Sequence, residues 1–143
     1  MIEGYGLLYS WDAANYLEEN KNSMLPEGWH VPVAEDYSNT ILQMNNLEPS
    51  STSTEGLYLK SKTGWDDNNG NDFFKFNGKP AGMNNWYTGR YEELGTTTTF
   101  WTNDSQSSSR KYGLYLSSSN NIFERATLDR WHGMSIRLVK SLT

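Results

Sequence analysis

Leu25-Pro26-Glu27-Gly28-Trp29-His30-Val31-Pro32 is the stretch of this sequence that constrains the fold most. Its prolines and its glycine exclude a continuous helix, and they bracket a Trp-x-Val pair whose apolar side chains favour burial. The stretch therefore predicts an ordered loop. Within it, His30 is expected to be a hydrogen-bonded framework residue.

The segments on either side are predicted from periodicity and turn residues. Before the loop, the aromatic-rich residues 5–11 predict a strand, and Asp12 is expected to cap a helix over residues 13–19. After the loop, apolar residues spaced by three and four predict an amphipathic helix over residues 34–47. These apolar residues are Tyr37, Ile41, Leu42, Met44 and Leu47. Residues 49–54 are a polar connector.

Beyond the connector, the sequence predicts short strands and loops without a further helix. β-branched and aromatic residues favour strands over 98–102, 112–116 and 135–139. Residues 103–109 and 117–121 are expected to be loops because they are rich in serine and asparagine.

The composition excludes several classes of function. Twelve Lys and Arg against 17 Asp and Glu give a net charge of −5, so no basic surface is expected to bind nucleic acid. The absence of cysteine removes disulfides, thiolate metal sites and cysteine nucleophiles. Residues 1–143 fit one domain. No apolar span and no signal peptide are found, so membrane insertion is not expected.

The chain resembles the Fibrobacter succinogenes major paralogous domain over nearly its whole length. The matching motifs are Tyr5-Gly6-x-Leu8-Tyr9-x-Trp11-x-Ala13-Ala14, Pro26-x-Gly28-Trp29-His30-Val31-Pro32, Leu59-Lys60-Ser61, Thr63-Gly64-Trp65, Pro80-Ala81-Gly82, Phe100-Trp101-Thr102 and Ile136-Arg137-Leu138-Val139-Lys140. That family is similar in fold to C-type lectin-like domains. The resemblance implies an α+β fold with two helices, small antiparallel sheets, and paired N- and C-terminal strands that bring the termini together.

The chain departs from the family pattern at three positions. Leu25 and Leu138 stand where family members commonly have cysteines, and Val33 stands where a helix-capping threonine is more common. The resemblance implies that the two leucines lie close together and replace a disulfide by packing. Burial of a leucine contributes roughly 1.5–3 kcal/mol, against roughly 2–4 kcal/mol for a disulfide.

Catalysis and metal binding have little support in the residues. Only His30 and His132 could serve as histidine general bases, and no serine lies in a Gly-x-Ser-x-Gly elbow, so an enzyme and a cofactor are not expected. The loop that contains Asp66, Asp67 and Asp72 is a weak calcium candidate whose spacing does not fit an EF-hand. A solvated turn is the preferred interpretation of this loop.

The tryptophans divide into two groups. Trp11, Trp29, Trp65 and Trp101 lie in framework motifs and are expected in the core. Trp86 and Trp131 lie in loop-like stretches rich in amides, Arg and His, where contact with a ligand and packing of the loops onto the body both remain open. The expected binding face comprises Asn84, Asn85, Trp86, Tyr87, Tyr91, Asn103, Asp104, Ser105, Arg130, Trp131 and His132.

The sequence favours a non-catalytic binding or adhesion domain. Its C-terminal-half loops would recognise a protein or glycan receptor on a cell surface. The resemblance implies display on a virion or a bacterial cell surface, including use as a phage receptor-binding protein or a retroelement-diversified variable protein. The competing hypothesis is a structural or assembly domain of a fibre or surface protein. The oligomeric state is left open.

Overall fold

The computed structural model describes residues 3–47 and 54–142, except for the side chains of residues 44, 45 and 47. The expected apolar positions Met44 and Leu47, and residues 49–53 of the connector, therefore lie outside what is described. The helices are α1 (Trp11–Glu19), α2 (Lys21–Met24), α3 (Ala34–Leu47) and α4 (Glu55–Leu59). The strands are β1 (Trp29–His30), β2 (Met83–Asn85), β3 (Arg90–Glu92), β4 (Thr97–Ser105), β5 (Arg110–Ser117), β6 (Glu124–Asp129) and β7 (Val139–Lys140).

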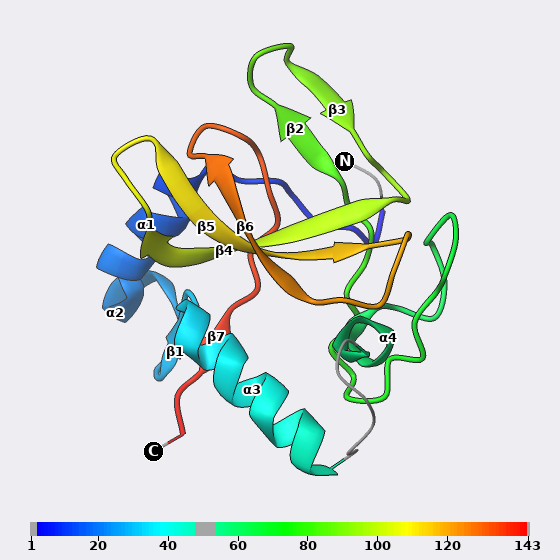
Figure 1. The fold of residues 1–143 in the computed structure, drawn as a ribbon. Helices are drawn as coiled ribbons and strands as arrows, with labels where there is room; N and C mark the ends of the chain where they lie inside the picture. The colour runs from blue at the N-terminus through cyan, green and yellow to red at the C-terminus, as the bar shows by residue number, and fades with distance from the viewer. Residues whose placement is uncertain (1–2, 48–53, 143) are drawn as a thin grey trace.

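The strands form small antiparallel sheets, which confirms the α+β class. The largest has the order β4-β5-β6, and the pairs β2-β3 and β1-β7 form the other two. Helix α3 lies along one side of the three-stranded sheet, and the β2–β3 hairpin projects from the opposite side (Figure 1). Residues 97–102 of β4 are buried because the strand runs through the middle of the molecule.

The core consists of two hydrophobic clusters, one on each side of β4. The first contains Tyr37, Leu59, Trp65, Phe100, Leu114, Leu116 and Phe123. The second contains Trp11, Ala14, Val31, Trp101 and Met134. Three of the four tryptophans expected in the core are buried, but the expectation is wrong for Trp29, which is 37% exposed. Trp29 lies on the two-stranded β1–β7 sheet, which is too small to cover it.

Helix α1 begins two residues before the expected start. Its cap is Ser10, whose hydroxyl accepts a hydrogen bond from the Ala13 backbone N–H at 3.3 Å. The prediction of Asp12 as the cap is wrong because Asp12 lies inside the first helical turn. The predicted strand over residues 5–11 is also wrong: this segment has one bridge, between Tyr9 and Met134.

Helix α3 has the predicted bounds, and its N-terminus is held by one carboxylate from a distant strand and one from its own first turn. The Asp104 carboxylate accepts a hydrogen bond from the Ala34 backbone N–H at 2.6 Å, and Asp36 accepts one from Val33 at 2.9 Å. The His30 ring lies 3.1 Å from the Asp36 carboxylate, which agrees with a framework role. Leu42, expected on the apolar face of the helix, is 57% exposed.

The C-terminal half contains more regular structure than expected. The expectation of no further helix is wrong, since α4 begins directly after the connector. Strands β2, β3 and β6 were not predicted, and β4 extends to Ser105, so residues 103–105 are strand and not loop. The last strand was placed too early: residues 135–138 lie outside regular strand, and β7 begins at Val139.

The N- and C-terminal strands do not pair as the resemblance implied, because the segment 5–11 forms no strand and holds only the Tyr9–Met134 bridge. The C-terminal strand pairs with β1, and Ser141 donates a backbone hydrogen bond to Gly28 at 2.8 Å. Residues Tyr5 to Leu8 line a groove beside β3, and residues 4–7 also line a pocket with Ile136, Arg137 and Leu138. Leu138 packs against the second core cluster and Leu25 is half-buried, while their mutual contact stays a prediction.

Within residues 3–47 and 54–142, no helix has both the length and the apolar character needed to cross a bilayer.

Candidate functional site

Four side chains from two separate segments form what we call the aromatic cluster: Trp86, Tyr87, Trp131 and His132. The ring centroids of Trp86 and Trp131 are 5.0 Å apart, and those of Trp86 and Tyr87 are 4.4 Å apart. Tyr87 also meets the His132 ring edge-on at 5.7 Å. The two tryptophans remain 43% and 46% exposed. The structure thus brings together these four residues of the expected binding face.

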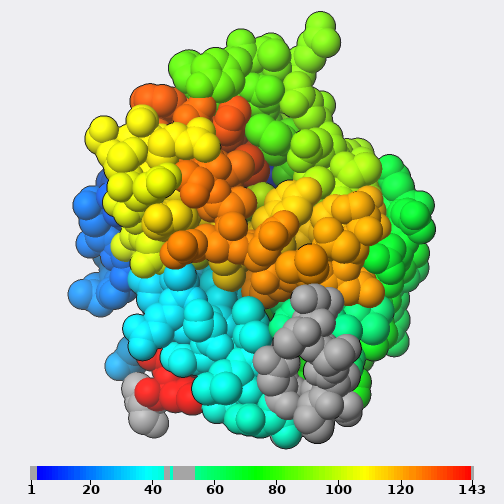
Figure 2. Space-filling model, viewed as in Figure 1, coloured from blue at the N-terminus to red at the C-terminus, as the bar shows by residue number. Residues whose placement is uncertain are grey.

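The cluster lies at one end of the molecule, where the hairpin adjoins the segment around residue 130 (Figure 2). Asn84 joins the two elements, because its backbone exchanges two hydrogen bonds of 2.9 Å with Gly133. A side chain at Gly133 would place its Cβ 2.9 Å from the Cβ of Asn84. Glycine therefore permits the close approach on which the aromatic contacts depend.

The hairpin turn fixes the direction of Trp86 and Tyr87. The Asn85 carbonyl accepts the Gly89 N–H at 2.7 Å, and the Asn85 side-chain oxygen accepts the Tyr87 N–H at 3.1 Å. Gly89 has a φ of +69°, which closes the turn in the left-handed region that glycine tolerates best. Both aromatic residues are consequently presented from an ordered turn.

Asp129, at the end of β6, joins the cluster to the three-stranded sheet. Its carboxylate accepts hydrogen bonds from the Tyr87 hydroxyl and from Arg110 Nη1, the latter at 2.8 Å. These two bonds, from Tyr87 first and then from Arg110, hold the pKa of Asp129 below its ordinary value. The same contact raises the pKa of the Tyr87 hydroxyl.

His132 is held between the hairpin and Asp129. Its Nδ1 accepts the Trp86 backbone N–H at 3.3 Å, so the neutral ring carries its proton on Nε2. Nε2 lies 3.9 Å from the Asp129 carboxylate. Both ring nitrogens thus face groups of the protein that hold the cluster together.

Arg130 is committed to contacts within the chain. Its guanidinium pairs with the Asp12 carboxylate, which raises the pKa of Arg130, and donates to the Ser108 carbonyl at 2.7 Å. It also lies over the Trp11 ring, 5.5 Å from the centroid. Arg130 therefore connects α1 to the β4–β5 turn.

The other expected binding residues lie elsewhere on the surface or in the fold. Asn103 donates its backbone N–H to the Pro32 carbonyl at 2.8 Å, and Asp104 caps α3. Ser105 is exposed at the end of β4. Tyr91, at 80% exposure, lines a groove with Leu7 and Leu94 instead of joining the cluster.

Sequence reasoning missed Asp129, which accepts the Tyr87 hydrogen bond, and Arg110, which bonds to the same carboxylate. The two residues are cross-strand partners in the β5–β6 register. Strand β6 was not predicted, so no signal placed them opposite each other. Tyr87 and Asp129 are 42 positions apart, so their hydrogen bond leaves no local pattern in the sequence.

Two of the calcium candidates stabilise the loop in which they lie. The carboxylates of Asp67 and Asp72 accept hydrogen bonds from the backbone N–H groups of Asn68 at 2.8 Å and Asn77 at 2.6 Å, respectively. In the part of the chain that is described, three or more His, Asp or Glu side chains do not gather as a metal site requires.

A buried lysine ammonium occupies the space between this loop and the sheet. Lys60 is 0% exposed, and its Nζ donates to the carbonyls of Asn68, Ser117 and Asn120 at 2.6, 3.1 and 2.9 Å. Burial lowers its pKa. Lys60 thus supplies the positive charge around which two loop carbonyls and the carbonyl of the last residue of β5 converge.

The fold and the site together define an α+β domain that presents ordered, half-exposed aromatic side chains. Comparison with known families matches residues 2–140 to the Fibrobacter succinogenes major domain. The chain belongs to this family, as its motifs suggested. No curated protein and no solved structure matches the chain.

Proposed function

We propose that this chain is a non-catalytic recognition domain that binds a protein or glycan receptor through the aromatic cluster. The observation that carries the proposal is the pair Trp86 and Trp131, each about half exposed although its neighbours hold it in place. Solvent-exposed tryptophans on an ordered surface supply large contact area at a low entropic penalty. Arg110 bonds to the carboxylate that holds Tyr87, and its partly exposed guanidinium offers a charged group beside the cluster for a ligand.

The finer description of the scaffold is part of the same proposal. We infer a C-type lectin-like arrangement, in which the regular elements hold the segment after α4 and the hairpin as binding loops. The bridge between Tyr9 and Met134, which joins the N-terminal segment to the C-terminal part of the chain, supports this arrangement. Display on a virion or a bacterial cell surface would suit such a domain, including as a phage or retroelement-diversified receptor-binding protein.

A defined panel of immobilised glycans and purified bacterial surface proteins tests the proposal. Binding should be lost or strongly weakened in Trp86→Ala and Trp131→Ala while thermal unfolding is unchanged. Trp29→Ala is the matched control, because Trp29 is 37% exposed on a different sheet. Equal loss in all three variants would contradict the assignment of the site.

A structural or assembly role is the second candidate, and one observation favours it. Leu7, Tyr91 and Leu94 are 53%, 80% and 48% exposed around a single groove beside β3. Exposed apolar residues grouped in this way mark contact surfaces more often than isolated ones do.

A further inference from the structure

Strand β3 has an open edge whose backbone groups are directed outward. In β2, the backbone N–H and C=O of Asn84 bond to Gly133 and therefore point away from β3. Asn84 and Tyr91 are opposite each other, so they form the non-hydrogen-bonded pair of the antiparallel ladder. It follows that the N–H and C=O of Tyr91 point away from β2. Within residues 3–47 and 54–142, neither group has a backbone partner.

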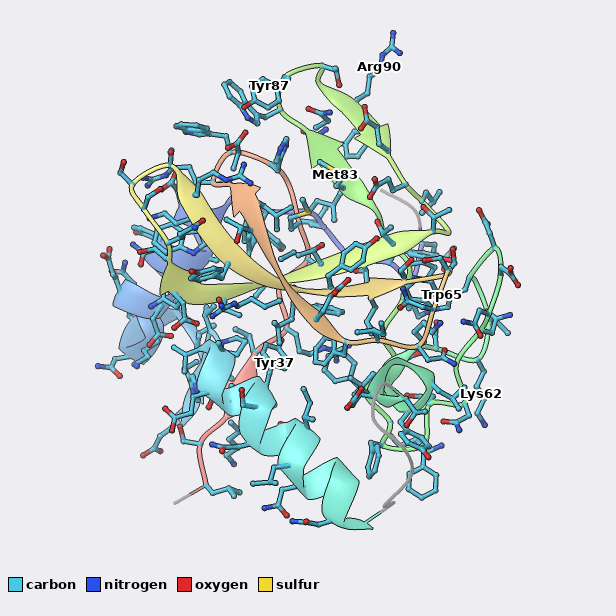
Figure 3. The ribbon with its side chains drawn as sticks, in the orientation of Figure 1. Tyr37, Lys62, Trp65, Met83, Tyr87 and Arg90 are labelled. Carbon is cyan, nitrogen blue, oxygen red and sulfur yellow. The ribbon has the colours of Figure 1, made fainter. Side chains whose placement is uncertain are left out.

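The charges on this edge are arranged symmetrically around Tyr91. Arg90 precedes it and Glu92 follows it, and both side chains lie on the face opposite to the Tyr91 ring because strand side chains alternate. Neither takes part in an ion pair among the described residues, although the Glu92 carboxylate accepts hydrogen bonds from the side chains of Asn85 at 3.2 Å and Thr88 at 3.5 Å. Arg90 projects away from the body of the protein, on the other side of the hairpin from Tyr87 (Figure 3).

This pattern is complementary to itself. If a second β3 runs antiparallel with Tyr91 opposite Tyr91, the two tyrosines exchange both backbone hydrogen bonds. Each Arg90 then stands directly opposite the Glu92 of the other copy, at the spacing at which cross-strand charges attract. A register shifted by two residues would lose both of these charge pairs.

The apolar side of the edge supports the same arrangement. The Tyr91 ring, Leu7 and Leu94 border a groove of about 340 Å³, and the first two are more than half exposed. Pairing of two copies would bring both grooves to one seam and remove these side chains from water. Edge strands with apolar flanks are the usual templates for such pairing.

We propose that two copies of this chain associate through antiparallel pairing of their β3 strands, centred on Tyr91. The contact uses three residues of each strand, so it is a weak and concentration-dependent one of the kind found in small interfaces. The aromatic cluster lies on the β2 side of the hairpin and stays exposed. If the proposed function holds, the dimer presents two binding faces and gains avidity on a multivalent surface.

Sedimentation of the full chain between about 10 µM and 1 mM, the range of weak association, measures the dimer directly. Arg90→Glu places like charges opposite each other twice and should raise the dissociation constant by at least about tenfold. The double variant Arg90→Glu/Glu92→Arg regenerates two opposite-charge pairs and should return to within about threefold of the wild type. Lys62→Glu is the matched control, because Lys62 is exposed, lies away from the hairpin and gives the same change in net charge.

Added salt should weaken the wild-type dimer because its ion pairs are exposed. A wild-type chain that stays monomeric across the whole range overturns the proposal. The proposal also fails if the double variant remains as weak as Arg90→Glu, or if Lys62→Glu weakens association equally. A monomer whose Tyr91 amide resonance shifts on addition of an extended peptide would assign this edge to another partner. None of these readouts depends on a receptor, so the dimer and the proposed function fail separately.

Discussion

The Tyr87 hydroxyl donates a hydrogen bond to the Asp129 carboxylate, which ties the tip of the β2–β3 hairpin to the end of β6. Arg110 reaches the same carboxylate from β5. Through this contact the position of the exposed tryptophans depends on the three-stranded sheet. The ordering of the aromatic cluster is thus a property of the fold and not of the turn alone.

Tyr87→Phe keeps the ring but removes this bond. The pKa of Asp129, now held below its ordinary value, should rise towards it. A depressed carboxyl pKa gives stability that is present above the unfolded-state pKa of about 3.9 and is lost as the pH falls through the folded-state pKa. Part of this acid sensitivity should disappear in the variant. Carboxyl NMR titration measures it, with Tyr91→Phe as the matched control, and an unchanged Asp129 titration would contradict the link.

Lys60→Met should destabilise the fold by roughly 2–5 kcal/mol, because it leaves three carbonyl acceptors, among them the buried carbonyl of Ser117, without their donor. Urea unfolding monitored by fluorescence measures the loss. Lys62→Met, at an exposed position nearby in sequence, should change stability little. Equal stability of Lys60→Met and wild type would mean that the ammonium does not organise these loops.

Tyr37→Phe should preserve or raise stability at neutral pH. The Tyr37 hydroxyl is buried and lacks a hydrogen-bond partner among the described residues, and such a group costs about 1–3 kcal/mol. Burial raises the pKa of Tyr37. The folded protein therefore keeps this proton when the unfolded chain loses it, and stability falls as the pH rises above about 10.

Chemical unfolding at pH 8 and at pH 10.5 separates the two effects. The advantage of Tyr37→Phe over the wild type should grow with pH, because phenylalanine has no proton to lose. A difference that is constant between the two pH values would show that Tyr37 does not contribute to alkaline unfolding. Lys60 changes stability with pH in the opposite direction. Because its pKa is lowered in the folded protein, the unfolded chain binds this proton more strongly, and the contribution of Lys60 to stability rises with pH.

Calcium or EDTA should leave the melting temperature unchanged. The carboxylates of Asp67 and Asp72 already accept backbone hydrogen bonds in their own loop, and the Lys60 ammonium lies beside it. A calcium-dependent rise in the melting temperature that Asp67→Ala abolishes would promote this loop to a metal site.

The parts of the fold that the sequence predicted correctly are those governed by local patterns. Helix α3 follows from apolar spacing, and the cores of β4 and β5 follow from β-branched and aromatic runs. Helix α4 does not, because it is a short helix held by a distant contact: the Gly56 N–H bonds to Asn121 at 2.8 Å. A side chain at position 56 would meet the Asn121 backbone at 2.7 Å, so tertiary packing selects the glycine.

The candidate site divides in the same way. Trp86 and Trp131 were placed outside the framework motifs because aromatic residues among amides and charges are unusual in a core. Asp104 was assigned to the binding face, but its carboxylate caps α3 at Ala34, which lies 70 positions earlier in the sequence. Asp129 and Arg110 were missed because only the β5–β6 register brings them together. The short strands β2 and β3 carry too few residues for alternation to be visible.

The affinity of Trp131→Ala for a receptor found on the glycan and surface-protein panel decides whether the aromatic cluster is the recognition surface. We expect a loss of about 2 kcal/mol or more, as for an aromatic hot spot, with an unchanged melting temperature. Trp29→Ala should bind with near wild-type affinity. Undiminished binding by Trp131→Ala, or unfolding of that variant, would contradict the claim that the aromatic cluster is the recognition surface.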